Sequence, residues 1–141
     1  FVTEDDFLTQ IRAGGFLEHA EVYGNRYGTL KSSVQEALAA GRDVLIVNDV
    51  QGALTLSAMA RQDNALGKAL QTLFIVVPDV AELRARLEER AADEASAIED
   101  RLAIAEAEMQ QQGQFDHVIV SSTRDADFER AQTIYQNAKA A

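Results

Sequence analysis

Three short apolar runs alternate with longer amphipathic stretches along the chain. Each run is close to continuously apolar, which is typical of a strand buried on both faces of a parallel sheet. The runs lie at residues 43–48, 73–77 and 117–120. Helical patterns lie before, between and after them, at residues 31–40, 51–60, 80–90, 93–112 and 125–139. Because strands alternate with helices of about ten or more residues, the pattern predicts one α/β domain with a mostly parallel sheet.

The N-terminal part of the chain predicts a different local arrangement. Thr3 is followed by three acidic residues and is a good N-cap for a short helix, which the glycines at 14–15 end. A strand is predicted over residues 16–23, and turn-forming residues follow at 24–25 and 27–28. This early strand and its turn predict a small antiparallel flap.

Composition and charge narrow the classes of function. The chain has 141 residues, a formal net charge of −10 and no cysteine. The acidic balance argues against binding to a nucleic acid polymer, which needs a positive surface, but a small phosphorylated ligand needs only a few local cations. The absence of cysteine excludes a disulfide framework and a thiolate metal site, and two separated histidines do not make a metal site. No apolar run approaches the roughly 18 residues of a membrane helix, so we expect a cytoplasmic protein that binds no membrane.

The most distinctive segment is residues 16–29, where acidic, aromatic, amide and hydroxyl side chains lie beside glycines. In a strand, Glu18 and Ala20 face the same way. A carboxylate on a protected face suits a ligand with two adjacent donors, as guanine has in its N1–H and exocyclic amine. The Thr29 hydroxyl could meet the guanine O6, and a tyrosine hydroxyl could reach a phosphate. The pattern alone still favours a polar hairpin without a ligand, because such turns are common.

Three arginines form the second candidate group. Arg86 and Arg90 are four residues apart and share a helix face, whereas Arg101 lies beyond an expected break in the helix. The pattern alone favours surface ion pairs, for example Arg86 with Glu82 or Arg90 with Asp93.

The segment 16–29 resembles the signature of the guanylate kinases. It reads Phe-Leu-Glu-x-Ala-Glu-Val-x-Gly-Asn-x-Tyr-Gly-Thr. The resemblance continues through residues 49–53, where Asp-Val-Gln-Gly-Ala is similar to the end of the family's Asp-x-Asp-x-Gln-Gly-Ala, through the arginines of 83–102, and through 115–120. It covers essentially the whole chain and implies a P-loop kinase-type three-layer fold with a GMP-binding flap and a helical lid. We therefore expect one guanylate-kinase-like domain over 1–141, a GMP-binding region over about 1–40 and a lid over about 86–105.

The resemblance also implies an activity and a GMP site. The family transfers the γ-phosphoryl group of ATP to GMP, giving GDP and ADP, with Mg²⁺. By that resemblance Glu18 would grip the guanine edge, with Thr29 beside it on the base. Tyr27 would touch the GMP phosphate, and Gly28 would allow close approach. Asp49 would lie near the GMP site at the carboxyl end of a parallel strand, where ligands of open α/β sheets bind.

The family's lid and sheet-edge arginines surround the ATP phosphates, and the resemblance assigns Arg86, Arg90 and Arg101 to these positions. Phosphoryl transfer depends on such cations, because the protein's task is to position the groups and to neutralise developing charge. The matched spacing of all three arginines outweighs the ion-pair alternative. GMP and ATP are thus the expected ligands, with Mg²⁺ as the expected cofactor and no metal ligand assigned in this chain.

The sequence departs from the family pattern at three places. It has no Gly-x-x-Gly-x-Gly-Lys-Ser/Thr loop, and the family's first, central strand is absent with it. Val47 stands where the family has the first aspartate of Asp-x-Asp, and Ser121 stands where the family has an asparagine on the adenine side. We expect the chain to be part of a longer protein and to be inactive alone. If it were complete, a swapped or rearranged homo-oligomer would be the next hypothesis.

Three functional hypotheses follow. The leading one is a guanylate kinase whose intact form supplies the missing loop. The second is a non-catalytic guanylate-kinase-like module that binds GMP or a phosphorylated protein segment through the same pocket. The third is an α/β structural fragment without a ligand.

Overall fold

The structure is a computed structural model that describes residues 2–22, 25–90 and 95–140. Within these ranges the side chains at 22, 64, 65, 89, 90 and 95–97 are not described. The chain forms two compact units, Phe1–Leu70 and Gln71–Ala141, and each is described by itself. The predicted bounds of a GMP-binding region and of a lid remain predictions.

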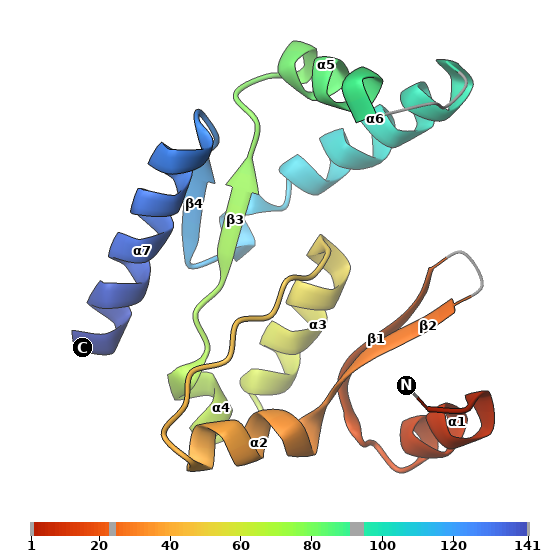
Figure 1. The fold of residues 1–141 in the computed structure, drawn as a ribbon, viewed down its shortest axis with the longest axis vertical. Helices are drawn as coiled ribbons and strands as arrows, with labels where there is room; N and C mark the ends of the chain where they lie inside the picture. Colours follow the sequence, from red (N-terminus) through yellow and green to blue (C-terminus); the bar gives the residue numbers. More distant parts are fainter. Residues whose placement is uncertain (1, 23–24, 91–94, 141) are drawn as a thin grey trace. The chain divides into compact units, whose positions relative to one another are not determined.

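The first unit contains four helices and one hairpin among its described residues (Figure 1). In chain order they are α1 (Glu4–Arg12), β1 (Phe16–Val22), β2 (Asn25–Leu30), α2 (Lys31–Ala39), α3 (Val50–Ala60) and α4 (Asn64–Ala69). The predicted antiparallel flap is confirmed, since β1 pairs with β2 from Phe16↔Leu30 to Val22↔Asn25. The turn predicted at 27–28 is wrong, because these residues lie within β2 and pair with residues 19–20 of β1. Helix α4 was not predicted.

Local signals account for α1. The Thr3 side chain accepts a hydrogen bond from the backbone N–H of Asp6, which is the N-cap arrangement that the sequence predicts. Gly14 has a φ of 65° just after the helix, a left-handed conformation that costs glycine little. Phe7 is the buried residue of the helix, and its ring packs 4.5 Å from the ring of Phe16 at the start of β1. This contact anchors the helix to the hairpin.

The core of the first unit joins the base of the hairpin to the helices that follow. Three buried side chains from different elements meet there, Leu17 of β1, Val34 of α2 and Leu56 of α3. Partly buried apolar side chains pack around them: Ile46, Met59, Leu66 and Leu70. Their burial removes apolar surface from water and fixes the start of β1 against α3.

The strand predicted over residues 43–48 is wrong for this structure. Residues 42–49 run from α2 to α3 without forming a helix or a strand (Figure 1). Leu45 and Val47 are 91% and 92% exposed, so the run is not buried on two faces. An apolar run predicts burial, but a strand also needs a neighbour that satisfies its backbone N–H and C=O groups. The described strands pair only as β1 with β2 and β3 with β4, so no strand lies beside this segment in a sheet.

The second unit is built on one parallel strand pair. Its elements are β3 (Leu73–Val76), α5 (Val80–Arg90), α6 (Ala95–Met109), the short 3₁₀ helix η1 (Gln112–Gln114), β4 (His117–Val120) and α7 (Arg124–Ala140). The predicted helices and the parallel direction are confirmed, with β3 and β4 in register from Leu73↔His117 to Val76↔Val120. Helix α7 packs on β4, and α5 packs on α6 (Figure 1).

The two strands of this pair are each covered on one face rather than on both. In β3, Phe74 and Val76 are buried while Ile75 is 57% exposed. In β4, Ile119 is buried while Val118 and Val120 are largely exposed. The prediction of strands buried on both faces therefore holds only in part.

A reciprocal hydrogen-bond pair fixes the start of this strand pair. The Asp116 carboxylate accepts hydrogen bonds from the backbone N–H and the hydroxyl of Thr72, at 2.8 and 2.7 Å. The Thr72 side-chain oxygen accepts in turn from the backbone N–H of Asp116 at 2.9 Å. The first ladder bond follows at once, from the His117 N–H to the Thr72 carbonyl. These bonds align the segments that lead into β3 and β4 just before the two strands begin.

Candidate functional site

One face of the β1–β2 hairpin carries the three side chains that the sequence predicts at a guanine site. Glu18 stands opposite Thr29 in the register, and Ala20 stands opposite Tyr27. Because side chains directly opposite one another lie on the same face, Glu18, Tyr27 and Thr29 share a face. The Thr29 hydroxyl donates a 2.6 Å hydrogen bond to Glu18 Oε1, and both side chains are partly buried. The structure therefore brings these predicted residues together.

This face offers more hydrogen-bonding capacity than the hairpin uses. A carboxylate has about four acceptor sites, and the Thr29 hydroxyl occupies one site of Glu18. The remaining sites can accept two parallel N–H donors from a planar ligand. Tyr27 is 60% exposed, and its hydroxyl has no hydrogen-bond partner among the described side chains. A ligand held by Glu18 could thus also reach a phenolic hydroxyl on the same face.

Gly28 lies on the opposite face of the hairpin, and its packing explains why no side chain fits there. A Cβ atom at this position would lie 2.8 Å from Cδ1 of Phe16 and 3.0 Å from the carbonyl oxygen of Glu18. His19 packs nearby, with its ring 6.0 Å from that of Phe16 and 6.4 Å from that of Phe7. The role predicted for Gly28, close approach to GMP, remains a prediction beside this packing role.

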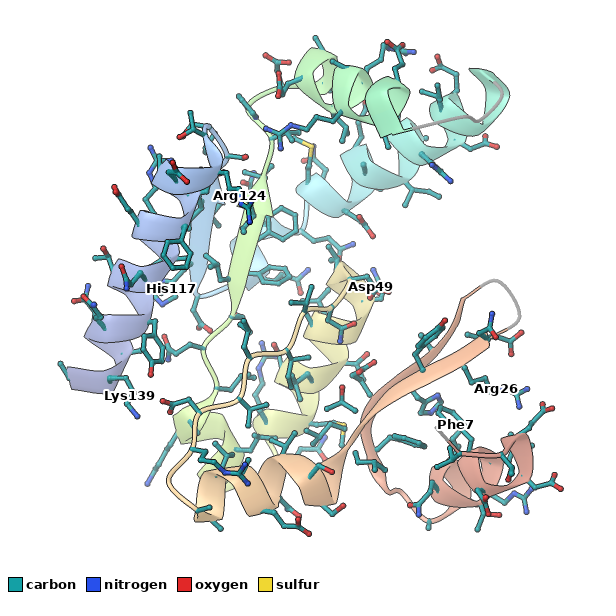
Figure 2. The ribbon with its side chains drawn as sticks, viewed as in Figure 1. Phe7, Arg26, Asp49, His117, Arg124 and Lys139 are labelled. Atoms are coloured by element: carbon teal, nitrogen blue, oxygen red, sulfur yellow. The ribbon has the colours of Figure 1, made fainter. Side chains whose placement is uncertain are left out.

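An ion-pair cluster holds the hairpin to α1. Arg26 of β2 contacts Glu4 of α1 at 2.5 Å and Glu21 of β1 at 3.3 Å. Figure 2 shows Arg26 and Phe7 directed into the space between the hairpin and the helix. This contact was not predicted from the sequence.

Asp49 begins α3 and is its N-cap. Its carboxylate accepts a 2.7 Å hydrogen bond from the N–H of Gly52, and Figure 2 shows it at the first turn of the helix. A Cβ atom at Gly52 would lie 2.3 Å from the side-chain amide nitrogen of Asn48, so this exposed side chain would have to move to admit it. The expected position at the carboxyl end of a parallel strand is not found, because residues 43–48 form no strand. The role of Asp49 near GMP remains a prediction.

Arg86 contacts both its own helix and the end of β4. Its Nε donates to Glu82 at 2.9 Å, so the ion pair proposed as an alternative is confirmed. Its Nη1 and Nη2 atoms donate to the hydroxyl of Ser121 at 3.3 and 3.2 Å. Ser121 is 6% exposed and follows β4 directly, and its N–H donates to the carbonyl of Val76, the last residue of β3. Arg86 therefore reaches the carboxyl ends of both strands.

A carboxylate on α7 completes this group and was not identified from the sequence. The Ser121 hydroxyl donates to Asp127 Oδ2 at 2.7 Å, and the N–H of Ser122 donates to Oδ1 at 2.9 Å. Arg130 donates to the Val120 carbonyl and lies 3.8 Å from the Asp127 carboxylate. The hydrogen bonds from Ser121 and Ser122 hold the pKa of Asp127 below its usual value, with a smaller contribution from Arg130. A serine pair after a buried strand and an aspartate in the first turn of the next helix are the available sequence signals.

The other two predicted arginines are not joined to Arg86 by any contact that the structure describes. Arg90 ends α5, and its side chain, like the predicted partner Asp93, lies outside the described residues. Arg101 is half-buried on α6. Helices α5 and α6 are linked instead by Arg84, which donates to the two carboxylate oxygens of Glu99 at 2.8 and 3.2 Å. A shared site of three arginines therefore remains a prediction.

The described part of the chain has neither a cluster that could hold a metal ion nor a helix that could span a membrane. Over residues 2–22, 25–90 and 95–140, no three His, Cys, Asp or Glu side chains converge in a way that could hold a metal ion. Within the same residues no helix combines the length and the apolar character needed to cross a bilayer.

Comparisons with known proteins agree on one family. The family model described as guanylate kinase matches residues 1–138. The guanylate kinase of Ruegeria pomeroyi is 39% identical over 134 residues, which is 95% of this chain and 61% of that protein. The guanylate kinase of Dechloromonas aromatica is 45% identical over 121 residues, which is 86% of this chain and 56% of that protein. The crystal structure of guanylate kinase from Anaplasma phagocytophilum is similar with a TM-score of 0.73 and 29% identity, covering 97% of this chain and 63% of that one.

Proposed function

The chain belongs to the guanylate kinase family and has its α/β fold, and on this basis we propose that its β1–β2 hairpin binds GMP for phosphorylation to GDP by ATP. The chain spans about three fifths of the length of the relatives it matches, so the activity of those whole proteins is given for this chain as a proposal. The observation that carries the proposal is the hydrogen-bonded pair of Glu18 and Thr29, which prepares a carboxylate on an accessible hairpin face.

Glu18 is proposed to recognise the guanine edge. Its carboxylate accepts hydrogen bonds from N1–H and from the exocyclic amine, two parallel donors that adenine does not present together. Thr29 has one hydroxyl hydrogen and donates it to Glu18, so its first role is to orient the carboxylate. A contact from Thr29 to the guanine O6 requires that the hydroxyl rotate away from Glu18. Tyr27, on the same face, is proposed to donate its hydroxyl to the GMP phosphate.

The ATP side is proposed to use cations of the second unit. Arg86 stands at the carboxyl ends of β3 and β4 with its guanidinium held by Glu82 and Ser121. Arg90 and Arg101 are proposed to join it around the phosphates. Mg²⁺ in such reactions neutralises charge between the phosphates. The described side chains contain no cluster that fits a metal ion, and Val47 is apolar, so no residue here is assigned to Mg²⁺.

A comparison of nucleotides tests the guanine assignment. Calorimetric titration with GMP, IMP and AMP probes the edge that Glu18 is proposed to read, because IMP lacks the exocyclic amine and AMP lacks both donors. We expect GMP to bind more tightly than IMP by about 1.5–3 kcal/mol, the usual value of a hydrogen bond to a charged group, and AMP to bind more weakly still. Equal affinities for GMP and AMP would show that the hairpin does not read guanine.

Titration with ATP separates the remaining hypotheses. Binding of GMP without ATP, in the protein that contains the whole domain, supports the non-catalytic module. Binding of both supports the kinase, and binding of neither supports a structural role.

A further inference from the structure

The hydroxyl of Ser121 lies between Arg86 and Asp127 and joins them. We propose that Asp127, acting through Ser121, is a positioning residue that fixes the Arg86 guanidinium for a phosphate group at the carboxyl ends of β3 and β4. The inference rests on the proposed function, in which Arg86 contacts the ATP phosphates. It adds Ser121 and Asp127, neither of which was predicted from the sequence to position Arg86.

The direction of the hydrogen bonds gives Asp127 its role. An ionised carboxylate only accepts hydrogen bonds, and an arginine guanidinium only donates them. The Ser121 hydrogen therefore goes to Asp127, at 2.7 Å, and the oxygen lone pairs face the two Nη atoms of Arg86, at 3.2 and 3.3 Å. Without Asp127 the hydroxyl could rotate and Arg86 would lose its fixed acceptor. The lowered pKa of Asp127 agrees with a carboxylate that accepts these bonds throughout the neutral range.

Burial makes Ser121 a connector between protein groups. The residue is 6% exposed, its N–H is bonded to the Val76 carbonyl, and its hydroxyl is bonded to both charged partners. Because its N–H and its hydroxyl are both bonded within the protein, its effect on a ligand passes through Arg86.

The charges around Arg86 leave it able to bind an anion. Asp127 meets Arg86 only through the hydroxyl, and it has its own cation in Arg130, 3.8 Å away. The direct partner Glu82 is one helical turn away on α5, and the side chains of this pair are 36% and 45% exposed. Exposed pairs of this kind are weak, so a phosphate can compete with Glu82. Three of the five guanidinium N–H groups have these partners, and two have none among the described residues.

The test uses inorganic tripolyphosphate as the probe and the NMR signal of the Arg86 guanidinium as the readout. The signal is assigned through Arg86→Lys, and the samples are the unchanged protein, Asp127→Ala, Asp127→Asn, Ser121→Ala and Ser121→Thr. Asp125→Ala is the matched control, because Asp125 is an exposed acid of the same helical turn.

We expect slow guanidinium rotation in the unchanged protein and a shift of the Arg86 signal that saturates with tripolyphosphate. In Asp127→Ala and Ser121→Ala the rotation should become faster and the affinity should fall on the order of threefold to tenfold, as for the loss of one hydrogen bond. Ser121→Thr, which keeps the hydroxyl, and Asp125→Ala should behave as the unchanged protein. Asp127→Asn keeps the shape of the side chain and controls for a folding defect in Asp127→Ala. Its tripolyphosphate affinity should fall between those of the unchanged protein and Asp127→Ala.

Two results would overturn the inference. One is an Arg86 signal that does not respond to tripolyphosphate in the unchanged protein, and the other is an unchanged affinity in both Asp127→Ala and Ser121→Ala. GMP titration of the same samples tests the proposed guanine site separately from the positioning role of Asp127. If GMP fails to bind while Arg86 still responds and depends on Asp127, only the guanine assignment fails. If GMP binds and Arg86 does not respond, only the present inference fails.

Discussion

The Thr29 hydroxyl donates a 2.6 Å hydrogen bond to the Glu18 carboxylate across the β1–β2 hairpin. The two residues are eleven positions apart in sequence and directly opposite in the antiparallel register. The hydrogen bond thus pre-orients Glu18, which is the only acidic side chain on this face among the described residues of β1 and β2. Pre-orientation of this kind lowers the entropy that a ligand contact must otherwise overcome.

Replacement of Thr29 by valine should weaken GMP binding indirectly. Thr29→Val keeps the shape of the side chain but removes the hydroxyl that holds Glu18. We expect the affinity for GMP to fall by about 0.5–1.5 kcal/mol, less than the loss of a charged contact to guanine itself. Calorimetry measures this, with Thr29→Ser as the variant that retains the hydroxyl. The same affinity in both variants would show that the hydroxyl is irrelevant to binding.

Replacement of Gly28 by alanine should destabilise the hairpin. The added methyl group would lie 2.8 Å from the Phe16 ring and 3.0 Å from the Glu18 carbonyl, so the strands must shift. Overpacking of this kind costs about 1–3 kcal/mol of the free energy of unfolding. Gly113→Ala is the matched control, since a Cβ there meets no atom within 4 Å. Urea unfolding measures both variants, and a loss no greater than that of the control would contradict the packing argument.

The Thr72–Asp116 pair should make stability depend on pH. Partial burial acts to raise the pKa of Asp116, but the hydrogen bonds from Thr72, helped by His117, outweigh it and lower the pKa below its usual value. Folding therefore favours the carboxylate. The stabilisation is complete above the unfolded pKa of about 3.9 and is lost as the pH falls through the lower folded pKa.

Asp116→Asn should accordingly lower the free energy of unfolding by about 1 kcal/mol at pH 7, a modest value because the carboxylate is only partly buried. The difference from the unchanged protein should shrink as the pH falls below about 4. Denaturant unfolding at several pH values measures it, with the exposed Asp125→Asn as control. A difference that stays constant down to strongly acidic pH would exclude the carboxylate as its source.

The 141-residue chain by itself should not convert ATP and GMP to ADP and GDP. Its sequence contains no Gly-x-x-Gly-x-Gly-Lys-Ser/Thr loop, so the amides and the lysine that hold the β- and γ-phosphates are absent from it. A coupled assay for ADP release measures this, with an intact guanylate kinase as positive control. Measurable turnover by the chain would show that other groups can hold the phosphates.

Elements with strong local signals could be predicted from the sequence. The N-cap at Thr3, the end of α1 at Gly14 and the strand that begins at Phe16 depend on residues close in sequence, and all three are confirmed. The apolar runs correctly placed β3 and β4. The run at 43–48 failed because a strand also depends on a partner, which an apolar pattern cannot supply.

The candidate site shows the same division. Glu18 and Thr29 were predicted at one candidate site, and the structure joins them by a hydrogen bond. The link from Arg86 through Ser121 to Asp127 could not be predicted, because it depends on parallel pairing that brings α5 and the start of α7 to the same strand ends. Arg86 and Ser121 are 35 positions apart and Ser121 and Asp127 are 6 apart, so neither contact joins neighbours on one helix or strand.

The most direct measurement is a double-mutant cycle on guanine recognition, with Glu18→Gln on the protein side and IMP in place of GMP on the ligand side. Glu36→Gln, at an exposed acid of α2 outside the ion pairs of the hairpin, is the control. Glu18→Gln replaces one acceptor by a donor, so we expect GMP affinity to fall by about 1.5–3 kcal/mol and the preference for GMP over IMP to disappear. An unchanged GMP affinity, or a preference over IMP that persists in Glu18→Gln, would contradict the assignment of the hairpin as the guanine site.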